Sequence, residues 1–158
     1  KGIQGMHARY FEGFKVGDTF ETRAVTLTEG QMVDFSMAYD PQPIHTDRQA
    51  SKKGIHGDMI SSGLQTLGFA NRLWIELGLM GENNLGGPGL DDVRWPRPVF
   101  AGDTMRTVVE VIAARESRSK PDRGLVTFGF TTYNQNDEVV MTYSCMDMIR
   151  RDPSISGG

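Results

Sequence analysis

The stretch D58-M-I-S-S-G-L-Q-T-L-G-F-A-N-R-L-W-I-E-L-G-L79 holds the longest helical pattern in the chain. Its apolar residues, among them Leu64 and Leu73, recur at the spacing of one helix face. Small residues such as Gly63 and Gly68 lie between them and indent the surface. We therefore expect a long helix over residues 58–79 that is buried closely against another layer.

The segments around this helix have the pattern of strands. Residues 126, 128 and 130 are all large and apolar, which is the alternation of a strand with one buried face. Short turn-forming stretches separate the later segments, so we expect antiparallel, hairpin-linked strands. One long helix and several strands predict an α+β fold in which a curved antiparallel sheet wraps around the central helix. The expected strands are Asp18 to Thr26, Leu90 to Trp95, Asp103 to Ala113, Gly124 to Asn134 and Glu138 to Arg150.

Length and composition predict a single domain. The chain has 158 residues, of which 38% are hydrophobic, and we find no internal repeat or linker that would divide it. We assign residues 9–151 to one domain, residues 1–8 to an N-terminal extension of natural or cloning origin, and residues 152–158 to a C-terminal tail.

Charge and residue usage exclude several classes of function. The net charge of −3 and the lack of a dense basic run argue against a nucleic-acid partner. No apolar stretch approaches the roughly 20 residues that cross a bilayer, so no membrane partner is expected. The single cysteine, Cys145, rules out an intrachain disulfide and a cysteine-based zinc site. A cytoplasmic location is the natural expectation.

A short helix and a proline-stiffened loop precede the long helix. Thr28 and Gln31 have the spacing of a capping box, which predicts a helix over about residues 29–39. Pro41 and Pro43 then disfavour helix and predict a stiff extended loop over residues 40–45. After the loop, Asp47 is expected to cap a short turn that runs through Lys53 and closes at Gly54.

Asp40 and His45, at the two ends of this loop, are the candidate catalytic residues. A carboxylate and an imidazole, with ordinary pKa values of about 3.9 and about 6.5, together can bind a water, take its proton and return a proton at neutral pH. On composition alone, a turn-capping Asp40 and a half-exposed His45 are the more common interpretation. A metal site of His45, Asp47 and His56 is a third interpretation, but it offers few candidate ligands. We predict no metal.

Gly57, in the run Ile55-His56-Gly57-Asp58, is the candidate oxyanion donor. It is expected to stand at the start of the long helix, where backbone amides lack internal partners and the helix dipole is positive. One such donor to a thioester oxygen is worth about 3 kcal/mol in the transition state. The alternative is a tight turn at Gly57 followed by Asp58 as the cap of the helix.

Taken together, the motifs resemble the MaoC-like dehydratase family. The resemblance runs in order from about Arg9 to Arg150, which is nearly the whole chain. The combination of the aspartate-to-histidine segment with the histidine-glycine pair is specific, and it outweighs the turn-capping interpretation. The matching segments are R9-Y-F-E-G-F-K-V-G-D18, A38-Y-D-P-Q-P-I-H-T-D47, I55-H-G57 and R94-W-P-R-P-V-F-A-G-D103.

The resemblance implies a hot-dog fold and an acyl-CoA hydratase or dehydratase similar to the (R)-specific enoyl-CoA hydratases. Asp40 and His45 would be the catalytic pair, and the amide of Gly57 would bind the thioester oxygen. The family also implies a homodimer, or a higher assembly of dimers, with acyl-CoA near the subunit boundary. No separate cofactor is implied, because CoA arrives as part of the substrate.

Two positions depart from the family pattern. Gln42 stands where the family often has Asn, and its amide still suits orientation of the loop or of the water. Asp58 follows Gly57 where the family often has an apolar residue, which leaves the role of Asp58 and the substrate class open. Acyl chain length, CoA versus acyl-carrier protein, and reaction direction also stay open. Several basic residues are candidates to bind the CoA phosphates, although each also fits an ordinary surface position. They are Arg94, Arg97, Arg115, Arg118, Lys120 and Arg123.

Two other functions fit the same residues. One is a hot-dog thioesterase, in which water attacks the thioester carbonyl instead of the alkene carbon. The other is a non-catalytic acyl-CoA-binding subunit that keeps the fold. The paired Asp40 and His45 favour the hydratase over both.

Overall fold

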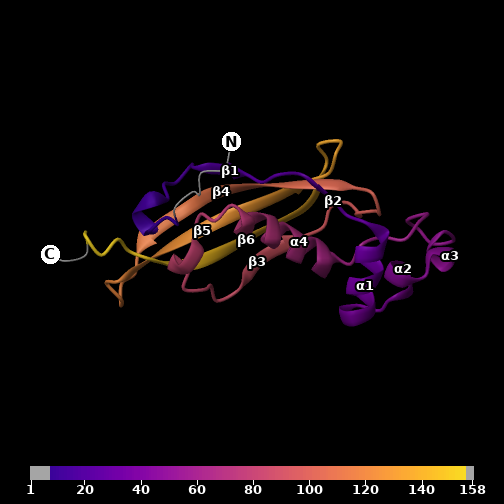
Figure 1. Cartoon of the computed structure of the whole chain (residues 1–158), viewed down its shortest axis with the longest axis horizontal. Helices are drawn as coiled ribbons and strands as arrows, with labels where there is room; N and C mark the ends of the chain where they lie inside the picture. The colour runs from indigo at the N-terminus through magenta and orange to yellow at the C-terminus, as the bar shows by residue number, and fades with distance from the viewer. Residues whose placement is uncertain (1–7, 156–158) are drawn as a thin grey trace, which may run out of the picture.

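The computed structural model describes residues 8–155, and it contains one curved sheet, one central helix and a small helical lobe (Figure 1). Residues 1–7, most of the expected N-terminal extension, and the last three residues of the expected tail lie outside the described residues. The strands are β1 (Thr19–Glu21), β2 (Val25–Thr26), β3 (Leu90–Arg94), β4 (Thr104–Glu116), β5 (Arg123–Tyr133) and β6 (Val139–Arg150). The helices are α1 (Glu29–Tyr39), α2 (Pro43–Thr46), α3 (Arg48–Ser51) and α4 (Gly63–Glu76), with 3₁₀ turns η1 (Phe11–Gly13) and η2 (Gly81–Asn83).

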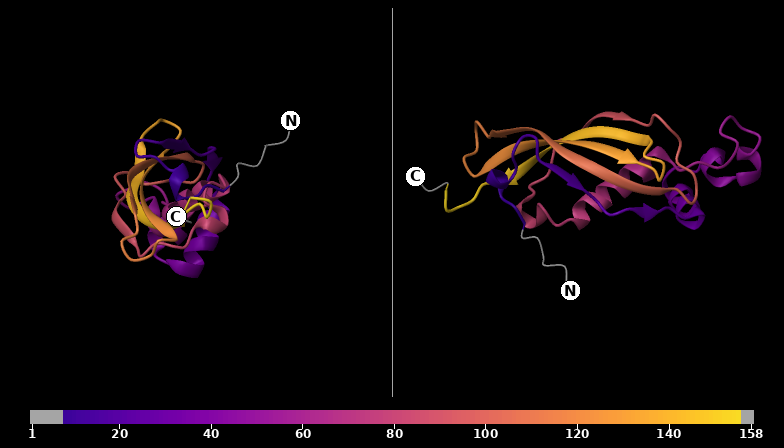
Figure 2. Two further views of the ribbon diagram at one scale, coloured as in Figure 1. Left: turned by 90° about the vertical axis from the view of Figure 1, so that its left-hand side faces the viewer. Right: turned by 90° about the horizontal axis from the view of Figure 1, so that it is seen from above.

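The sheet is antiparallel and has the strand order β1-β4-β5-β6-β3, with β2 also paired to β4. Its long strands β4, β5 and β6 curve over α4, and helices α1 to α3 project beyond one end of the sheet (Figures 1 and 2). A curved antiparallel sheet packed on a central helix is the hot-dog fold, so the predicted fold class is confirmed. No helix within residues 8–155 is both long and apolar enough to span a bilayer.

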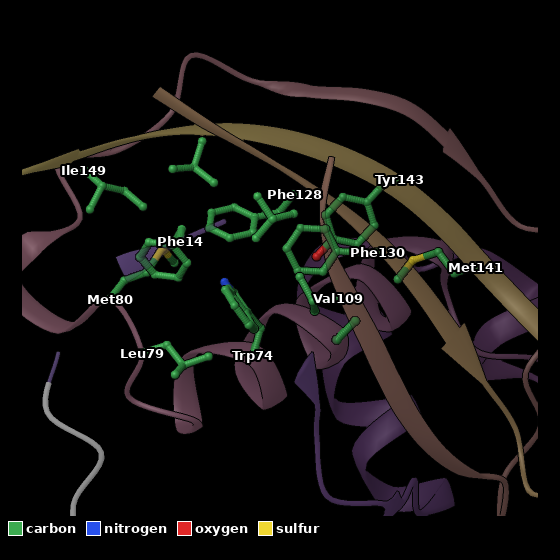
Figure 3. Packing of buried hydrophobic residues seen from close by; sticks show 13 residues of the cluster. Phe14, Trp74, Leu79, Met80, Val109, Phe128, Phe130, Met141, Tyr143 and Ile149 are labelled. Atoms are coloured by element: carbon green, nitrogen blue, oxygen red, sulfur yellow. The ribbon is translucent and has the colours of Figure 1, made fainter. Parts of the chain in front are cut away.

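The main core lies between α4 and the concave face of the sheet (Figure 3). Trp74 of α4 is 2% exposed, and its ring centroid is 5.2 Å from that of Phe128 and 5.9 Å from that of Phe130. Phe130 in turn stacks on Tyr143 of β6, with ring centroids 4.3 Å apart. Aromatic pairs of this kind bury a large apolar area, so they fix α4 against the sheet.

A second, smaller core anchors the helical lobe. Leu27 and Met32, on either side of the start of α1, pack with Met59, Val99 and Met105, and all five are at most 3% exposed. This cluster joins α1 to the segment before α4 and to the segment before β4. The end of α1 is thereby held next to the start of α4.

The local sequence signals up to α2 predict the structure correctly, with two exceptions. Helix α1 has the predicted bounds, and Thr28 and Gln31 form the predicted capping box. The expected strand over residues 18–26 is wrong as a single element, because the chain breaks it into β1 and β2. The expected extended loop over residues 40–45 is extended only as far as Gln42, because Pro43 occupies the first turn of α2, a position where its missing N–H costs nothing.

The expected start of the long helix is also wrong. Helix α4 begins at Gly63 instead of residue 58, and Ser62 is its N-cap. Residues 59–61 are drawn into extended pairing instead, since Ile60 forms a β-bridge with Phe100 and the N–H of Ser61 donates to Val99 O at 2.7 Å. Gly57 therefore lies six positions before the helix instead of at its first turn.

Candidate active site

A cavity of about 480 Å³ opens at the N-terminal end of α4. Its lining includes polar residues of the α1–α2 connection and residues 95–99 after β3, which are apolar except for Arg97. Its size is in the range of small-molecule sites. The lining residues are Asp40, Gln42, His45, His56, Ile60, Ser61, Gly63, Leu64, Thr66, Trp95, Pro96, Arg97, Pro98 and Val99.

Asp40 stands at the end of α1, and its carboxylate accepts two hydrogen bonds. The hydroxyl of Ser62 donates to Oδ2 at 2.6 Å, and the side-chain amide of Gln42 donates to Oδ1 at 2.7 Å. These two bonds, that from Ser62 first, hold the pKa of Asp40 below its ordinary value. Asp40 is therefore a carboxylate at neutral pH. Gln42, a tentative substrate contact in the sequence, lies in the cavity lining and orients Asp40.

His45 lies on α2 and is 5% exposed. Its Nδ1 is 2.8 Å from the carbonyl oxygen of Ile60. A carbonyl can only accept, so we assign the proton of the neutral ring to Nδ1. The Nε2 atom then carries a lone pair, and it lies 3.4 Å from Oδ2 of Asp40. The structure thus brings the two predicted catalytic residues together, with a basic nitrogen beside a carboxylate.

Gly63 opens α4 within the same cavity lining. Within residues 8–155, no acceptor is found for its backbone N–H, as is usual for the first position of a helix. Its carbonyl accepts a hydrogen bond from Nε1 of Trp95 at 3.1 Å. A Cβ built on Gly63 would lie 2.7 Å from Cε2 of Trp95, so a side chain here would displace the indole. Glycine therefore allows both the indole contact and access to the amide.

Gly57 does not occupy the position that the sequence suggested. Its N–H donates to Gly54 O at 3.2 Å, and Gly57 is not among the described residues that line the cavity. Its φ of +73° suits a tight turn, which was the alternative interpretation. Asp58 does not cap the helix. Its carboxylate accepts two hydrogen bonds from Arg48 and forms an ion pair with it.

The other candidate ligand residues are dispersed. Within residues 8–155, no three His, Cys, Asp or Glu side chains lie close enough together to hold a metal ion. Of the basic candidates, Arg97 lines the cavity and is 3.4 Å from Glu138, while Arg94 pairs with Asp92 at 2.7 Å. The basic candidates of residues 115–123 lie at the β4–β5 hairpin, at the end of the sheet away from α1–α3 (Figure 1).

The sequence interpretation missed Ser62, Gly63 and Trp95. The available signal was the pair Ser62-Gly63, a capping residue followed by a flexible one, inside the apolar run. It was obscured because the run before it, from Met59, already has helical spacing. The contact between Trp95 and Gly63 spans 32 positions, and no local pattern predicts it.

Comparisons with known proteins agree on one family. The model of the MaoC like domain family matches residues 12–134. The uncharacterized protein YdeM of Bacillus subtilis is 30% identical over 138 residues, which cover 87% of this chain and 96% of YdeM. The crystal structure of the MaoC-like dehydratase from Rhodospirillum rubrum is 30% identical, with a TM-score of 0.83 over 92% of this chain and 99% of that one.

A more distant structure shares the fold. The R-hydratase PhaJ1 from Pseudomonas aeruginosa, in its unliganded form, has a TM-score of 0.72 and 20% identity. The match covers 90% of this chain and 86% of that one. At this identity the likeness concerns the fold alone.

Proposed function

This chain belongs to the MaoC-like domain family, and from that premise we propose that it is an acyl-CoA hydratase/dehydratase. It adds water to, or removes water from, the α,β double bond of an enoyl-CoA thioester. The observation that carries the proposal is the 3.4 Å approach of His45 Nε2 to Asp40 Oδ2 at the wall of a cavity. A water that bridges these two atoms from the cavity side has an acceptor for each of its protons.

In the hydration direction, the water oxygen attacks the β-carbon of the substrate. Asp40 accepts one hydrogen bond from the water and orients it, while His45 Nε2 takes the other proton. The resulting imidazolium is stabilised by the adjacent Asp40 carboxylate and returns the proton to the α-carbon on the same side. The hydroxyl ends on the β-carbon and the proton on the α-carbon, and dehydration runs the same steps in reverse.

Gly63, in place of Gly57, is the proposed donor to the thioester oxygen. Attack at the β-carbon moves negative charge through the conjugated system onto that oxygen. The free N–H of Gly63 lies at the positive end of α4 and stabilises this charge. Trp95 supports the donor, because its indole bonds to the carbonyl of Gly63. Arg97, at the lining of the same cavity, is the proposed contact for a CoA phosphate.

We also propose that the protein is a homodimer that pairs through α4 and the free edge of β3. Leu64 and Ile75 on the outer face of α4 are each 53% exposed, Leu90 on β3 is 48% exposed, and Gly68 is exposed between the two helix residues. Strand β3 is at the edge of the sheet and pairs only with β6 within residues 8–155. An unpaired edge beside an apolar helix face suits a second copy related by a two-fold axis.

The test measures the hydration of a short trans-2-enoyl-CoA through the loss of enoyl absorbance. It compares the wild-type protein with the variants Asp40→Asn and His45→Ala. Each variant is expected to lose at least about 100-fold in kcat while keeping the wild-type circular dichroism spectrum. Near wild-type turnover in a folded variant removes that residue from the chemistry. Release of free thiol without hydrated product identifies a thioesterase instead, and neither reaction across a panel of acyl chains identifies a non-catalytic binding subunit.

A further inference from the structure

The proposed active-site cavity has an open end and a buried end. Leu64 and Trp95 belong to its lining and are about half exposed. Ser61 and Thr66 belong to the same lining, but they are only 6% and 2% exposed. A whole CoA group is too large for a cavity of about 480 Å³, so it has to stay at the open end. The acyl group is therefore the part of a thioester substrate that reaches Ser61 and Thr66.

The hydroxyl groups of Ser61 and Thr66 lie on the same part of this lining. Oγ of Ser61 is 3.2 Å from the carbonyl oxygen of Ser62, and Oγ1 of Thr66 is 3.4 Å from that same oxygen. The side chain of Ser62 in turn donates to Asp40, the proposed catalytic carboxylate. A group bound by the two hydroxyls therefore lies on the acyl chain close to the reacting carbons.

The proton of the Ser61 hydroxyl is directed into the protein. Nε2 of Gln65 donates to the carbonyl oxygen of Gln31 at 2.9 Å, so the other end of the amide, Oε1, faces Ser61. Oγ of Ser61 donates to this Oε1 at 3.0 Å, and in the described part of the chain no other donor reaches Oε1. Turning the proton toward the cavity would leave a buried acceptor unpaired, which is unfavourable. Ser61 therefore presents lone pairs to the cavity and accepts hydrogen bonds there.

The Thr66 hydroxyl, in contrast, is free to donate. Its 3.4 Å bond to the Ser62 carbonyl is long for a bond between two oxygens. That carbonyl also accepts from the N–H groups of Gln65 at 3.0 Å and of Thr66 at 3.1 Å, so it stays paired when the hydroxyl turns away. Within residues 8–155, no donor reaches the hydroxyl oxygen of Ser61 or of Thr66. One acceptor and one available donor match the two hydrogen-bonding functions of a hydroxyl group.

We propose that the cavity selects an enoyl thioester whose acyl group carries a hydroxyl group next to the double bond. This inference rests on the proposed hydratase function and names its substrate class. The substrate hydroxyl donates to Oγ of Ser61 and accepts from Oγ1 of Thr66. A substrate with a methyl group in the same place removes water from both protein hydroxyls without replacing its hydrogen bonds, so it is used less well.

The experiment compares two esters that differ in one group. They are trans-4-hydroxybut-2-enoyl-CoA and trans-pent-2-enoyl-CoA, which has a methyl group in place of the hydroxyl. The readout is the ratio of kcat/KM for the hydroxylated ester to kcat/KM for the methyl ester. The ratio in each variant is divided by that of the wild type, which cancels the different intrinsic reactivity of the esters and any general loss of activity.

Ser61→Ala and Thr66→Val are each expected to lower this ratio about tenfold, because each removes one hydrogen bond to the substrate hydroxyl. Thr66→Ser keeps the hydroxyl and is expected to keep the ratio. Thr131→Val is the matched control, because it makes the same change on β5, outside the cavity lining, and it too should keep the ratio. A ratio that neither Ser61→Ala nor Thr66→Val changes overturns the proposal.

A binding measurement separates this proposal from the proposed reaction. The same two esters are titrated by calorimetry into His45→Ala, which the proposed mechanism makes inactive, and into the double variant His45→Ala/Ser61→Ala. The single variant is expected to bind the hydroxylated ester more tightly, and the double variant is expected to lose that preference. If the wild type hydrates neither ester but the preference is found, the hydratase function is wrong and the hydroxyl site stands. If the wild type hydrates both esters and the preference is absent, only the hydroxyl site is wrong.

Discussion

The hydroxyl of Ser62 lies 2.6 Å from Oδ2 of Asp40, and this hydrogen bond joins the start of α4 to the end of α1. The same hydroxyl oxygen accepts from the N–H of Leu64 at 3.3 Å, so it also caps α4. Ser62 is fully buried. One side chain thus fixes the position of the proposed catalytic carboxylate relative to the helix that carries the proposed oxyanion donor.

Ser62→Ala is expected to change the pH dependence of the reaction. The Ser62 hydrogen bond is the largest cause of the lowered pKa of Asp40, so its loss raises that pKa. Because the proposed mechanism needs ionised Asp40, the acidic limb of kcat/KM moves to higher pH. The Asp40 side chain also loses the contact that holds it in place, and for that reason we expect kcat/KM at neutral pH to fall about tenfold. Initial rates across the pH range measure both effects.

Ser62→Thr provides the matched control, since it keeps a hydroxyl that can both donate to Asp40 and cap α4. It is expected to restore most of the activity and the wild-type acidic limb. If Ser62→Ala lowers kcat/KM equally at every pH, Ser62 does not set the pKa of Asp40 and acts only by positioning Asp40 or by capping the helix.

Two glycine variants distinguish the candidate oxyanion donors. Gly63→Ala places a Cβ against the indole of Trp95, so the indole must shift, and the new methyl group stands next to the Gly63 amide. We expect about 100-fold lower kcat, the usual effect of losing one oxyanion donor, although alanine is the better helix former. Gly57→Ala is expected to lower the melting temperature, because Gly57 has a φ of +73°, and to leave kcat within about twofold.

The measurements are kcat for an enoyl-CoA and thermal denaturation of both variants. A large loss of kcat in Gly57→Ala, with Gly63→Ala fully active, restores the assignment made from sequence and contradicts the one made from structure.

The sequence predicted the elements whose signals are local, and it failed where distant residues decide. The capping box of Thr28 and Gln31 fixed the start of α1, and Pro41 fixed its end. The start of α4 was misplaced because Ile60 pairs with Phe100, forty positions away, and helical spacing alone does not reveal that pairing. The same error put Gly57, instead of Gly63, at the expected start of the helix.

In the candidate site, too, the residues with local signals were predicted and those that depend on distant contacts were not. Asp40 and His45 were identified from their spacing and from the family resemblance, and the structure brings them to one cavity. Trp95 lines that cavity from a segment 50 positions beyond His45. This segment is part of the family resemblance, but no local pattern assigns Trp95 to the cavity.

Asp147→Asn is expected to stabilise the protein at neutral pH. Burial raises the pKa of Asp147 in the folded protein. The unfolded chain therefore ionises first as pH rises above about 4, and stability falls until the folded pKa is passed. Removing this charge is expected to raise the free energy of unfolding by about 1 kcal/mol at pH 7.5, which raises the melting temperature by about 2–4 °C. The difference is expected to shrink as the pH is lowered toward 4.

Thermal denaturation at several pH values measures the effect, and Asp34→Asn controls for the change in net charge. Burial also raises the pKa of Cys145 to about 12, so its thiol stays protonated and still donates to the amide oxygen in Asp147→Asn. If Asp147→Asn is less stable than the wild type at pH 7.5, the buried Asp147 carboxylate does not destabilise the folded protein and the prediction is wrong.

Gly68→Glu tests the proposed dimer. Gly68 lies in the middle of the exposed face of α4, and nothing is within 4 Å of a Cβ built there. In a single chain the larger residue is tolerated and even favours the helix. In a dimer that pairs through this face, a buried carboxylate would separate the two copies. We therefore expect Gly68→Glu to elute as a monomer in size-exclusion chromatography with light scattering, at an unchanged or higher helix content.

Gly30→Glu is the matched control, because Gly30 is also a helical glycine with open space around its Cβ position, on α1. It should elute with the mass of the wild type, and a wild-type mass for Gly68→Glu as well would place the interface on another surface.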